Sequence, residues 1–345
     1  MSFKDSILSK SNQFNYYKDK TAELNKENKE LKNEISLLSP DLEDGISLVV
    51  PVYKAENHIA PLLESLEKQS LSRDLFEIIF IINGELDSTM DILTDFAISN
   101  EDMNVIISYT KEAGVSNARN IGIRIAKRQF LGFVDSDDFI SESYLESLYR
   151  HSAPNRVVMP NFIDINEETG EEVESYLVPF SMNKSGIIKG APSEMADLAI
   201  TTAKILPTLV AKSTEYNTKL LNGEDISFYA RLYPKFDLEF YFVDKKEAAT
   251  YYRLRRFDSV SRQSMSYQFN VLDRLKVMDD INESLLNLRK NDKRHERFLK
   301  VLMRGQSMFM VRYLKENPQD RDKVIEEVKK HDFVYFPYER LDLDQ

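Results

Sequence analysis

The chain has 345 residues, of which 42% are hydrophobic and 30% are charged, and this composition predicts a folded protein with a sizeable core in one large domain or two. Its formal net charge of -11 argues against a nucleic-acid binder, and its lack of cysteine excludes disulfides and thiolate metal sites. No apolar run approaches the roughly 20 residues that span a bilayer, and residues 1–13 lack the apolar core of a signal peptide, so we expect a cytoplasmic protein.

Residues 1–44 are polar and rich in Lys, Glu and Asn, which predicts a helical arm. Leu24, Leu31 and Leu38 recur every seven residues, as in a coiled coil. The residues between them are polar, so a strong coiled coil lacks its second apolar stripe. We favour a helix that packs on its own domain; an arm that dimerises or binds a partner is the alternative.

Four short apolar runs follow, separated by segments in which apolar residues have helical spacing. The expected strands cover residues 46–53, 76–82, 103–109 and 130–134, and the expected helices cover residues 58–70, 88–99 and 117–128. This alternation indicates an α/β fold with a mostly parallel sheet covered by helices on both faces. In such sheets ligands bind beyond the carboxyl ends of the strands.

In the second half of the chain, the expected strands and helices alternate less regularly. An extended segment is expected over residues 156–165, and a turn over residues 168–172. Helices are expected over residues 141–151, 192–205, 223–233, 267–288, 295–316 and 320–331. In the penultimate helix, an apolar stripe has the spacing of a packed helix face and comprises Phe298, Leu302, Phe309 and Tyr313.

The segment VDSDD places three carboxylates directly after the expected strand 130–134. Oxygen ligands suit Mg2+ or Mn2+, and a site with one or two protein carboxylates leaves room for substrate phosphates. Asp135, Asp137 and Asp138 are therefore candidates for a metal site. The alternative is an acidic turn in which Asp138 or Ser136 caps the next helix.

Two further clusters could carry chemistry. In NGEDISF, Gly223 lets the backbone turn sharply before Glu224 and Asp225, either of which could serve as a general base or simply favour the helix N-terminus. In YYRLRRFDSVSRQ, arginines interleaved with serines suit phosphate oxygens, although a solvated basic loop has the same composition.

Five segments, in this order, resemble the family 2 glycosyltransferases with the GT-A fold. They are ISLVVPVYKAENHIAPLLESLEKQS, EIIFIINGELDSTMDIL, EAGVSNARNIGIRIAKRQFLGFVDSDDFI, NGEDISFYARL and YYRLRRFDSVSR. The third is the most specific, since its Gly, Ala-Arg-Asn and Asp-Ser-Asp-Asp elements all stand in the family's order. The resemblance implies a GT-A domain over residues 45–262, between a helical arm (1–44) and a C-terminal helical region (263–345).

The resemblance also implies roles for individual residues. Asp225 would be the catalytic base, with Glu224 supporting it or touching the acceptor. Asp137 would be the main metal ligand, with Asp135 near the metal or the ribose. The implied nucleotide-binding residues are Pro51, Val52, Tyr53, Glu56, Asn83, Arg119 and Asp135, and those implied to face the diphosphate are Arg255, Ser259 and Arg262.

One position departs from the family's pattern. Many relatives carry an Asp pair where this chain has Ile82 and Asn83. An amide both donates and accepts, so Asn83 can still pair with a base edge. Uracil remains the preferred base.

The implied reaction is the inverting transfer of a sugar from a nucleotide diphosphate sugar, preferably a UDP-sugar, to a hydroxyl of a glycan or lipid-linked acceptor, with Mn2+ or Mg2+ as cofactor. A catalytically silent relative that binds a sugar nucleotide or a partner enzyme is the alternative. The basic stretch 289–304 leaves open a peripheral contact with an anionic membrane, and the helical regions leave open a homo-oligomer. A nucleotidyltransferase or a dehydrogenase is disfavoured, because no glycine-rich loop follows a strand.

Overall fold

The computed structural model describes residues 42–173, 185–188, 199, 202–255 and 265–341. Contacts divide the chain into two compact units, Met1–Leu42 and Glu43–Gln345. The arm expected over residues 1–44 lies almost entirely outside the described residues and stays a prediction. The expected boundary at residue 262 lies inside the second unit and stays a prediction as well.

Eight strands form the main sheet, in the order β3-β2-β1-β4-β10-β6-β11-β9. Their bounds are β1 (Glu43–Val52), β2 (Phe76–Asn83), β3 (Asn104–Thr110), β4 (Arg128–Phe133), β6 (Arg156–Met159), β9 (Gly186–Ile188), β10 (Ile205–Pro207) and β11 (Glu239–Phe242). β1 pairs in parallel with both β2 and β4, and β2 pairs in parallel with β3, which confirms the parallel part of the expected sheet. β10 runs antiparallel to β4 and β6, so the helix expected over residues 192–205 is wrong at its end, where residues 202–204 are not helical and Ile205 is in a strand. Most of the remainder of that expected helix lies outside the described residues.

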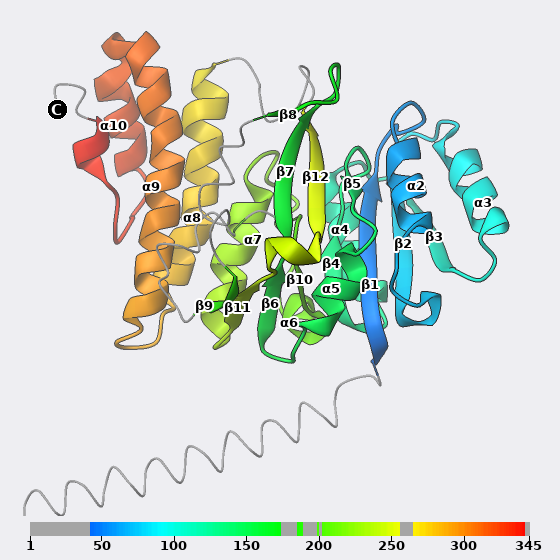
Figure 1. Ribbon diagram of the computed structural model, residues 1–345. Coiled ribbons are helices and arrows are strands. Elements are labelled where there is room, and N and C mark those ends of the chain that lie inside the picture. The colour runs from blue at the N-terminus through cyan, green and yellow to red at the C-terminus, as the bar shows by residue number, and fades with distance from the viewer. Residues whose placement is uncertain (1–41, 174–184, 189–198, 200–201, 256–264, 342–345) are drawn as a thin grey trace, which may run out of the picture. The chain divides into compact units, whose positions relative to one another are not determined.

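Apolar side chains on both faces of the first strands explain why this sheet is sandwiched between helices. In β1, Val49 belongs to one core cluster, whereas Leu48 and Val50 belong to the other. The helices α4 (Val115–Ile125), α6 (Thr208–Lys212) and α7 (Glu224–Leu232) contribute to the first cluster, and α2 (Ala60–Glu67), α3 (Thr89–Ser99) and α5 (Tyr144–Arg150) contribute to the second. Figure 1 shows β1 near the middle of the first four strands.

A second sheet has the strand order β5-β12-β7-β8 and was not expected. Its strands are β5 (Phe139–Ile140), β7 (Asn161–Asn166), β8 (Glu172–Val173) and β12 (Thr250–Arg255). The extended segment expected over residues 156–165 is in fact β6 and β7, which belong to different sheets and meet at Pro160, where the N–H needed by a strand ladder is missing. β12 joins β5, just after the acidic segment, to β7.

The C-terminal part is helical, as expected. A π-helical turn, η6 (Gln268–Leu272), leads into α8 (Asp273–Leu286), which is followed by α9 (Lys293–Glu316) and α10 (Arg321–Lys329). α8 contacts α7 on one side and α9 on the other, and Figure 1 shows these helices beside the sheet. Phe298, Leu302 and Tyr313 are buried as expected, but Phe309 remains partly exposed.

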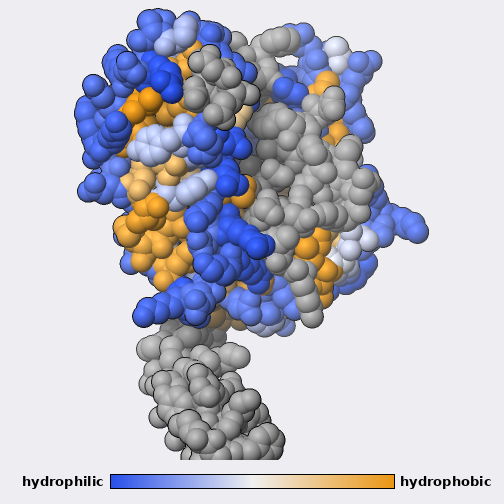
Figure 2. All heavy atoms as spheres, turned by 90° about the vertical axis from the view of Figure 1, so that its left-hand side faces the viewer, coloured by the Kyte–Doolittle hydropathy of each residue, from blue (hydrophilic) through white to orange (hydrophobic). Residues whose placement is uncertain are grey.

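The outer face of these helices mixes charged and apolar side chains. Figure 2 shows hydrophobic residues gathered between hydrophilic ones on this face. Several basic residues of the stretch 289–304 are paired: Lys293 and Lys300 both contact Glu296, and Arg294 contacts Asp237. Among the described residues, no helix is long and apolar enough to cross a membrane. Peripheral membrane contact stays a prediction, and these pairs weaken the charge that would support it.

Candidate active site

A pocket of about 880 Å3 lies at the carboxyl ends of β1, β2 and β4, where α/β sheets commonly bind ligands. It continues past the start of α7 to the C-terminal helices. The residues that line it are Pro51, Tyr53, His58, Asn83, Ala113, Gly114, Val115, Arg119, Asp135, Ser136, Asp137, Leu221, Asn222, Gly223, Glu224, Asp225, Ile226, Leu254, Phe269, Arg274, Gln306 and Phe309.

The acidic segment turns two of its three carboxylates toward this pocket. Asp135 and Asp137 line it, whereas Asp138 is only 3% exposed. Asp138 accepts hydrogen bonds from the Tyr251 hydroxyl at 2.6 Å and from the Leu254 backbone N–H at 2.9 Å. Burial, and next the charge of Asp137, raise its pKa well above the ordinary value. The alternative in which Asp138 or Ser136 caps the next helix is therefore wrong: α5 begins only at Tyr144, and Asp138 fastens the segment to β12.

Arg119 connects the acidic segment to the start of α7. This side chain is 5% exposed and contacts Asp135 at 3.0 Å and Glu224 at 2.9 Å. Burial alone would lower the pKa of Arg119, but chiefly the charge of Asp135, with those of Tyr216 and Glu224, holds that pKa above its ordinary value. Arg119 therefore fixes the distance between the candidate metal ligand and the candidate catalytic pair.

The left-handed conformation of Gly223 (φ 74°) allows the turn that starts α7. A Cβ at this position would lie 2.9 Å from Val277 Cγ2, so close packing against α8 also favours glycine. The next two residues, Glu224 and Asp225, thereby reach the pocket from the helix N-terminus.

The surroundings of Asp225 suit a general base. Burial and then the charge of Glu224 raise its pKa to about 7, although the backbone N–H of Ile226, Arg119 and Lys204 all oppose that rise. A base works best when its pKa lies near the operating pH. Lys204 is fully buried, with its Nζ 4.2 Å from the centre of the Tyr229 ring, and burial lowers its pKa to about 7 against the charge of Asp225.

Oxygen chemistry at Asp135 and Asp137 fits a hard divalent cation. Both carboxylates line the pocket, and the Asp135 side chain is 36% exposed, so each is accessible to an ion and its water. No group of three or more potential protein ligands occurs in the part of the chain that the structure describes. The expected site, in which one or two carboxylates share the metal with substrate phosphates, stays a prediction.

The nucleotide-binding residues implied by the resemblance divide into two groups. Pro51, Tyr53 and Asn83 line the pocket together with Arg119 and Asp135. Two others do not line it: Val52 is fully buried, and Glu56 accepts hydrogen bonds from the backbone N–H and the hydroxyl of Ser88.

Asn83 uses its amide to hold the backbone around the pocket. Its Nδ2 donates to the Val52 carbonyl at 2.8 Å, and its Oδ1 accepts from the Gly114 N–H at 2.9 Å. The side chain is 3% exposed. The amide therefore holds the Val52 carbonyl and the Gly114 N–H at a fixed spacing, and its pairing with a base edge stays a prediction.

The diphosphate-facing residues implied by the resemblance are only partly described. Arg255 does not line the pocket; its Nε lies 3.9 Å from the buried Asp164, which also binds Arg253 through two hydrogen bonds of 2.8 and 2.7 Å. Ser259 and Arg262 lie outside the described residues. Their roles at the diphosphate stay predictions.

The chain is similar in sequence to known proteins. A sequence model of glycosyl transferase family 2 matches residues 47–239, more than half of the chain. The chain belongs to this family. The protein EpsH of Bacillus subtilis is 34% identical over 132 residues, which cover 38% of this chain and 37% of that protein. The poly(ribitol-phosphate) beta-N-acetylglucosaminyltransferase TarS of Staphylococcus aureus is 28% identical over 184 residues, which cover 53% of this chain and 29% of TarS. The matches thus span well under half of these relatives.

Solved structures support the fold. S. aureus TarS 1–349 in complex with UDP superposes with a TM-score of 0.59 at 22% identity, covering 79% of this chain and 72% of that one. The same fragment with UDP-GlcNAc gives a TM-score of 0.60 at 23% identity, covering 79% and 73%. At this level of identity, the likeness establishes the GT-A fold of this family 2 member.

Four pocket residues come from the helical region that follows the family match. They are Phe269, Arg274, Gln306 and Phe309. No sequence pattern singled out Arg274 or Gln306, and the apolar stripe that contains Phe309 indicated packed core. The only signal we can identify for them is a long polar side chain at a position that the helical spacing turns toward the apolar face.

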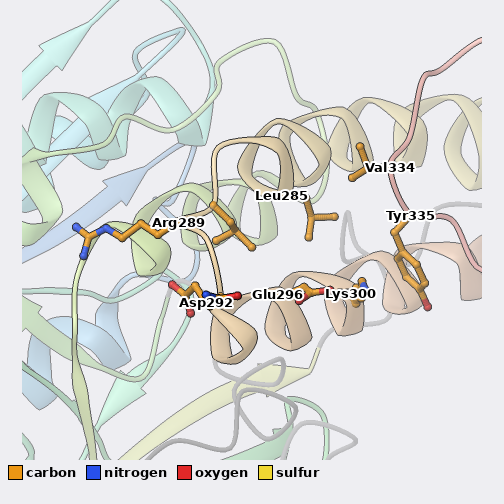
Figure 3. Close-up of a pocket in the computed structure, with 9 residues that line it drawn as sticks. Leu285, Arg289, Asp292, Glu296, Lys300, Val334 and Tyr335 are labelled. Atoms are coloured by element: carbon orange, nitrogen blue, oxygen red, sulfur yellow. Dashed lines mark hydrogen bonds and ion pairs between the residues drawn. The ribbon is translucent and has the colours of Figure 1, made fainter. Parts of the chain in front are cut away.

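A smaller pocket of about 280 Å3 lies between α8, α9 and the segment that contains Val334 and Tyr335. Figure 3 shows Glu296 and Lys300 along α9, with Leu285 and Val334 on the opposite side. Its central carboxylate, Glu296, already contacts Lys293 at 2.9 Å and Lys300 at 2.7 Å. The hydrogen bonds from Lys300 and Lys293 lower the pKa of Glu296 to about 2, so this carboxylate is stabilised without any ligand.

Proposed function

We propose that this chain catalyses the metal-dependent, inverting transfer of a sugar from a nucleoside diphosphate sugar, preferably a UDP-sugar, to a hydroxyl of a glycan, glycolipid or polymer. The main supporting observation is that Asp135 and Asp137 share one pocket with Asp225, whose pKa suits a base. Family membership supports the class of reaction.

In the proposed mechanism, the donor binds at the strand ends, with its nucleoside near Pro51 and Tyr53 and its diphosphate toward Asp135 and Asp137. Asp135 and Asp137 would hold a divalent cation such as Mn2+ or Mg2+, which would supply positive charge to the departing diphosphate. Arg119 keeps Asp135 in place for this purpose, because it contacts that carboxylate and Glu224 together.

Asp225 accepts the proton of the acceptor hydroxyl. The hydroxyl oxygen forms a bond to the anomeric carbon of the sugar while the bond from that carbon to the diphosphate oxygen breaks. The proton ends on Asp225, the nucleoside diphosphate leaves with its negative charge, and a single displacement inverts the anomeric configuration. Glu224 stabilises the arrangement through Arg119.

The names of the relatives support the choice of donor and acceptor. TarS has been solved with UDP and with UDP-GlcNAc. Another relative is a poly(ribitol-phosphate) beta-glucosyltransferase from Bacillus spizizenii. It is 37% identical over 111 residues, which cover 32% of this chain and 18% of that protein. We therefore propose a UDP-sugar as donor and a cell-surface polymer or its lipid-linked precursor as acceptor.

A panel of UDP- and GDP-sugars, assayed for release of free nucleotide, tests this proposal. We expect slow, metal-dependent hydrolysis of one or a few UDP-sugars without acceptor, abolished by a chelator and by Asp137→Ala. If sugar nucleotides bind by calorimetry but none is cleaved at any metal concentration, the chain is a silent binding protein. If none binds, the proposed donor class is wrong.

A further inference from the structure

The pocket extends beyond the catalytic carboxylates onto a wall made by the C-terminal helices. This wall contains Arg274 from α8, Phe269 from η6, and Gln306 and Phe309 from α9. Gly223, which directly precedes Glu224 and Asp225, lies against this arginine: a Cβ on Gly223 would be 3.4 Å from Arg274 Nη1. The wall therefore adjoins the candidate base on the side of α7.

The guanidinium of Arg274 is buried but incompletely bound. The residue is 4% exposed, and the guanidinium carbon lies 4.6 Å from the centre of the Phe269 ring and 4.5 Å from that of Phe309. Its Nε donates to the Phe269 carbonyl at 3.2 Å, and its Nη1 donates to Gln306 Oε1 at 3.5 Å. Its Nη2 is buried and has no hydrogen-bond partner among the described residues.

A buried cation needs compensation for the water that it loses. The two rings supply part of it through cation–π contacts, and no carboxylate forms an ion pair with Arg274 within the described ranges. Burial lowers the pKa of Arg274, and the charges of three acidic residues act against this without forming an ion pair with it; they are Asp273, Asp225 and Glu224. An anion with several oxygens that enters the pocket would satisfy Nη2 and supply the missing charge.

The position of Arg274 assigns that anion to the acceptor. The donor side of the pocket is formed by the strand ends at Pro51, Tyr53 and Asn83, whereas Arg274 lies beyond Gly223, on the helical wall. An acceptor whose hydroxyl reaches Asp225 must occupy the part of the pocket that the donor leaves free. The helical wall is the part that satisfies this condition.

We propose that Arg274, with Gln306 and the two phenylalanines, forms an acceptor subsite that binds a phosphate group next to the hydroxyl to be glycosylated. The guanidinium fork matches phosphate oxygens in geometry and charge. This inference rests on the proposed glycosyltransferase function, and it narrows the acceptor to phosphate-bearing polyol or sugar chains as opposed to neutral glycans.

The test uses binding as well as turnover. Calorimetry measures binding of an oligomer of glycerol phosphate units, in the presence of UDP and Mn2+, to the wild type, to Arg274→Met and to Arg312→Met. Arg312 is the matched control, because it is exposed and lies 5.6 Å from the same Phe309 ring without lining the pocket. We expect Arg274→Met to weaken this binding about tenfold or more and Arg312→Met to leave it unchanged.

UDP affinity and acceptor-independent UDP-sugar hydrolysis are then measured for the wild type and Arg312→Met, which we expect to differ by less than about twofold. In Arg274→Met, UDP affinity should change far less than oligomer affinity. Where transfer is detected, the KM for the phosphate oligomer should rise in Arg274→Met while the KM for a neutral oligosaccharide does not. Equal oligomer binding by wild type and Arg274→Met overturns the inference, and so does a loss of UDP affinity in that variant. Absence of hydrolysis in every protein contradicts the proposed function, whereas loss of oligomer binding in Arg274→Met alone still supports the subsite.

Discussion

The two buried arginines of the pocket, Arg119 and Arg274, have opposite surroundings. Arg119, on the sheet side, contacts two carboxylates, and Arg274, on the helical side, contacts rings, a carbonyl and an amide oxygen. Each guanidinium has one buried nitrogen without a hydrogen-bond partner among the described residues, Nε of Arg119 and Nη2 of Arg274, but only the charge of Arg119 is balanced by carboxylates in contact with it. This difference suggests that the protein itself balances the charge of Arg119 on the sheet side of the pocket, whereas the charge of Arg274 on the helical side is available to a bound anion.

The largest expected effect concerns the residue between these walls. Asp225→Asn keeps the shape of the side chain but removes the proton acceptor, so we expect transfer to fall by about a hundredfold to ten-thousandfold. Donor affinity, measured by calorimetry, should stay near the wild-type value because the donor binds at the strand ends.

Asp237→Asn is the matched control for that variant, since the Asp237 side chain is 97% exposed and lies outside the pocket. It should retain full activity. Near-normal transfer by Asp225→Asn would show that Asp225 is not the base and that another residue of the pocket accepts the proton.

The second prediction compares the stabilities of two variants with the same replacement. Arg119→Met leaves Asp135 and Glu224 without their cation, and breaking a buried pair typically costs about 3–5 kcal/mol of unfolding free energy. We expect the lower end of that range, because the Asp135 side chain is 36% exposed to water. Arg274→Met breaks no ion pair among the described residues and should leave stability equal or higher.

Urea denaturation of both variants measures this difference directly. If Arg274→Met is as destabilised as Arg119→Met, the protein's own contacts stabilise the guanidinium of Arg274 as much as that of Arg119. The contrast between the two arginines would then be wrong.

The sequence predicted the sheet wall far better than the helical wall, for a physical reason. Apolar strands such as β1 and β2 have a clear local pattern, and the carboxyl ends of parallel strands are a general place for a site, so Asp135 and Asp137 could be placed in advance. Asp225 followed from the family resemblance and from Gly223. The turn before it also depends on the packing of Val277, which no local pattern reveals.

The helical wall depends on tertiary contacts instead. Arg274 and Phe309 belong to different helices, and each alone looks like a residue on an amphipathic surface. β12 was missed because its Tyr and Arg residues suggested a basic loop, yet Arg253 pairs with the buried Asp164 of β7. Such pairs between distant segments leave no periodic signal.

The third prediction concerns pH. Asp225 must be ionised to act as a base, and its pKa is raised to about 7, so kcat/KM should fall as the pH drops below about 7. The charged groups around it are Glu224 and Arg119 from the sheet side, Lys204, and Arg274 from the helical side. Glu224→Gln removes the negative charge that helps raise this pKa, and the acid limb should therefore shift to lower pH.

The matched change is Lys204→Met, which removes a cation that lowers the pKa of Asp225 and should shift the same limb to higher pH. Profiles of kcat/KM between about pH 5 and pH 9 measure both shifts. Limbs that coincide in the two variants would show that a different group controls the reaction.

The smallest expected effect concerns two neighbouring tyrosines, one of which contacts the acidic segment that contains Asp135 and Asp138. The Tyr251 hydroxyl donates to Asp138 at 2.6 Å and accepts from the Asp135 N–H at 3.2 Å. Tyr144, whose ring lies 6.4 Å from that of Tyr251, has a buried hydroxyl with no partner among the described residues. Both rings are completely buried, so replacement by Phe removes one oxygen from the same environment in each case.

Tyr251→Phe should cost about 1–3 kcal/mol of unfolding free energy, because it removes the donor to Oδ2 of the buried Asp138 and leaves only the Leu254 N–H bound to Oδ1. Tyr144→Phe should be neutral or stabilising. Tyr251→Phe should also raise the concentration of Mn2+ needed for half-maximal activity, since the backbone of Asp135 loses its anchor. An unchanged metal requirement together with reduced stability would limit Tyr251 to a purely structural role. A change in both quantities would indicate that the buried Tyr251–Asp138 contact positions the carboxylates on which the proposed chemistry depends.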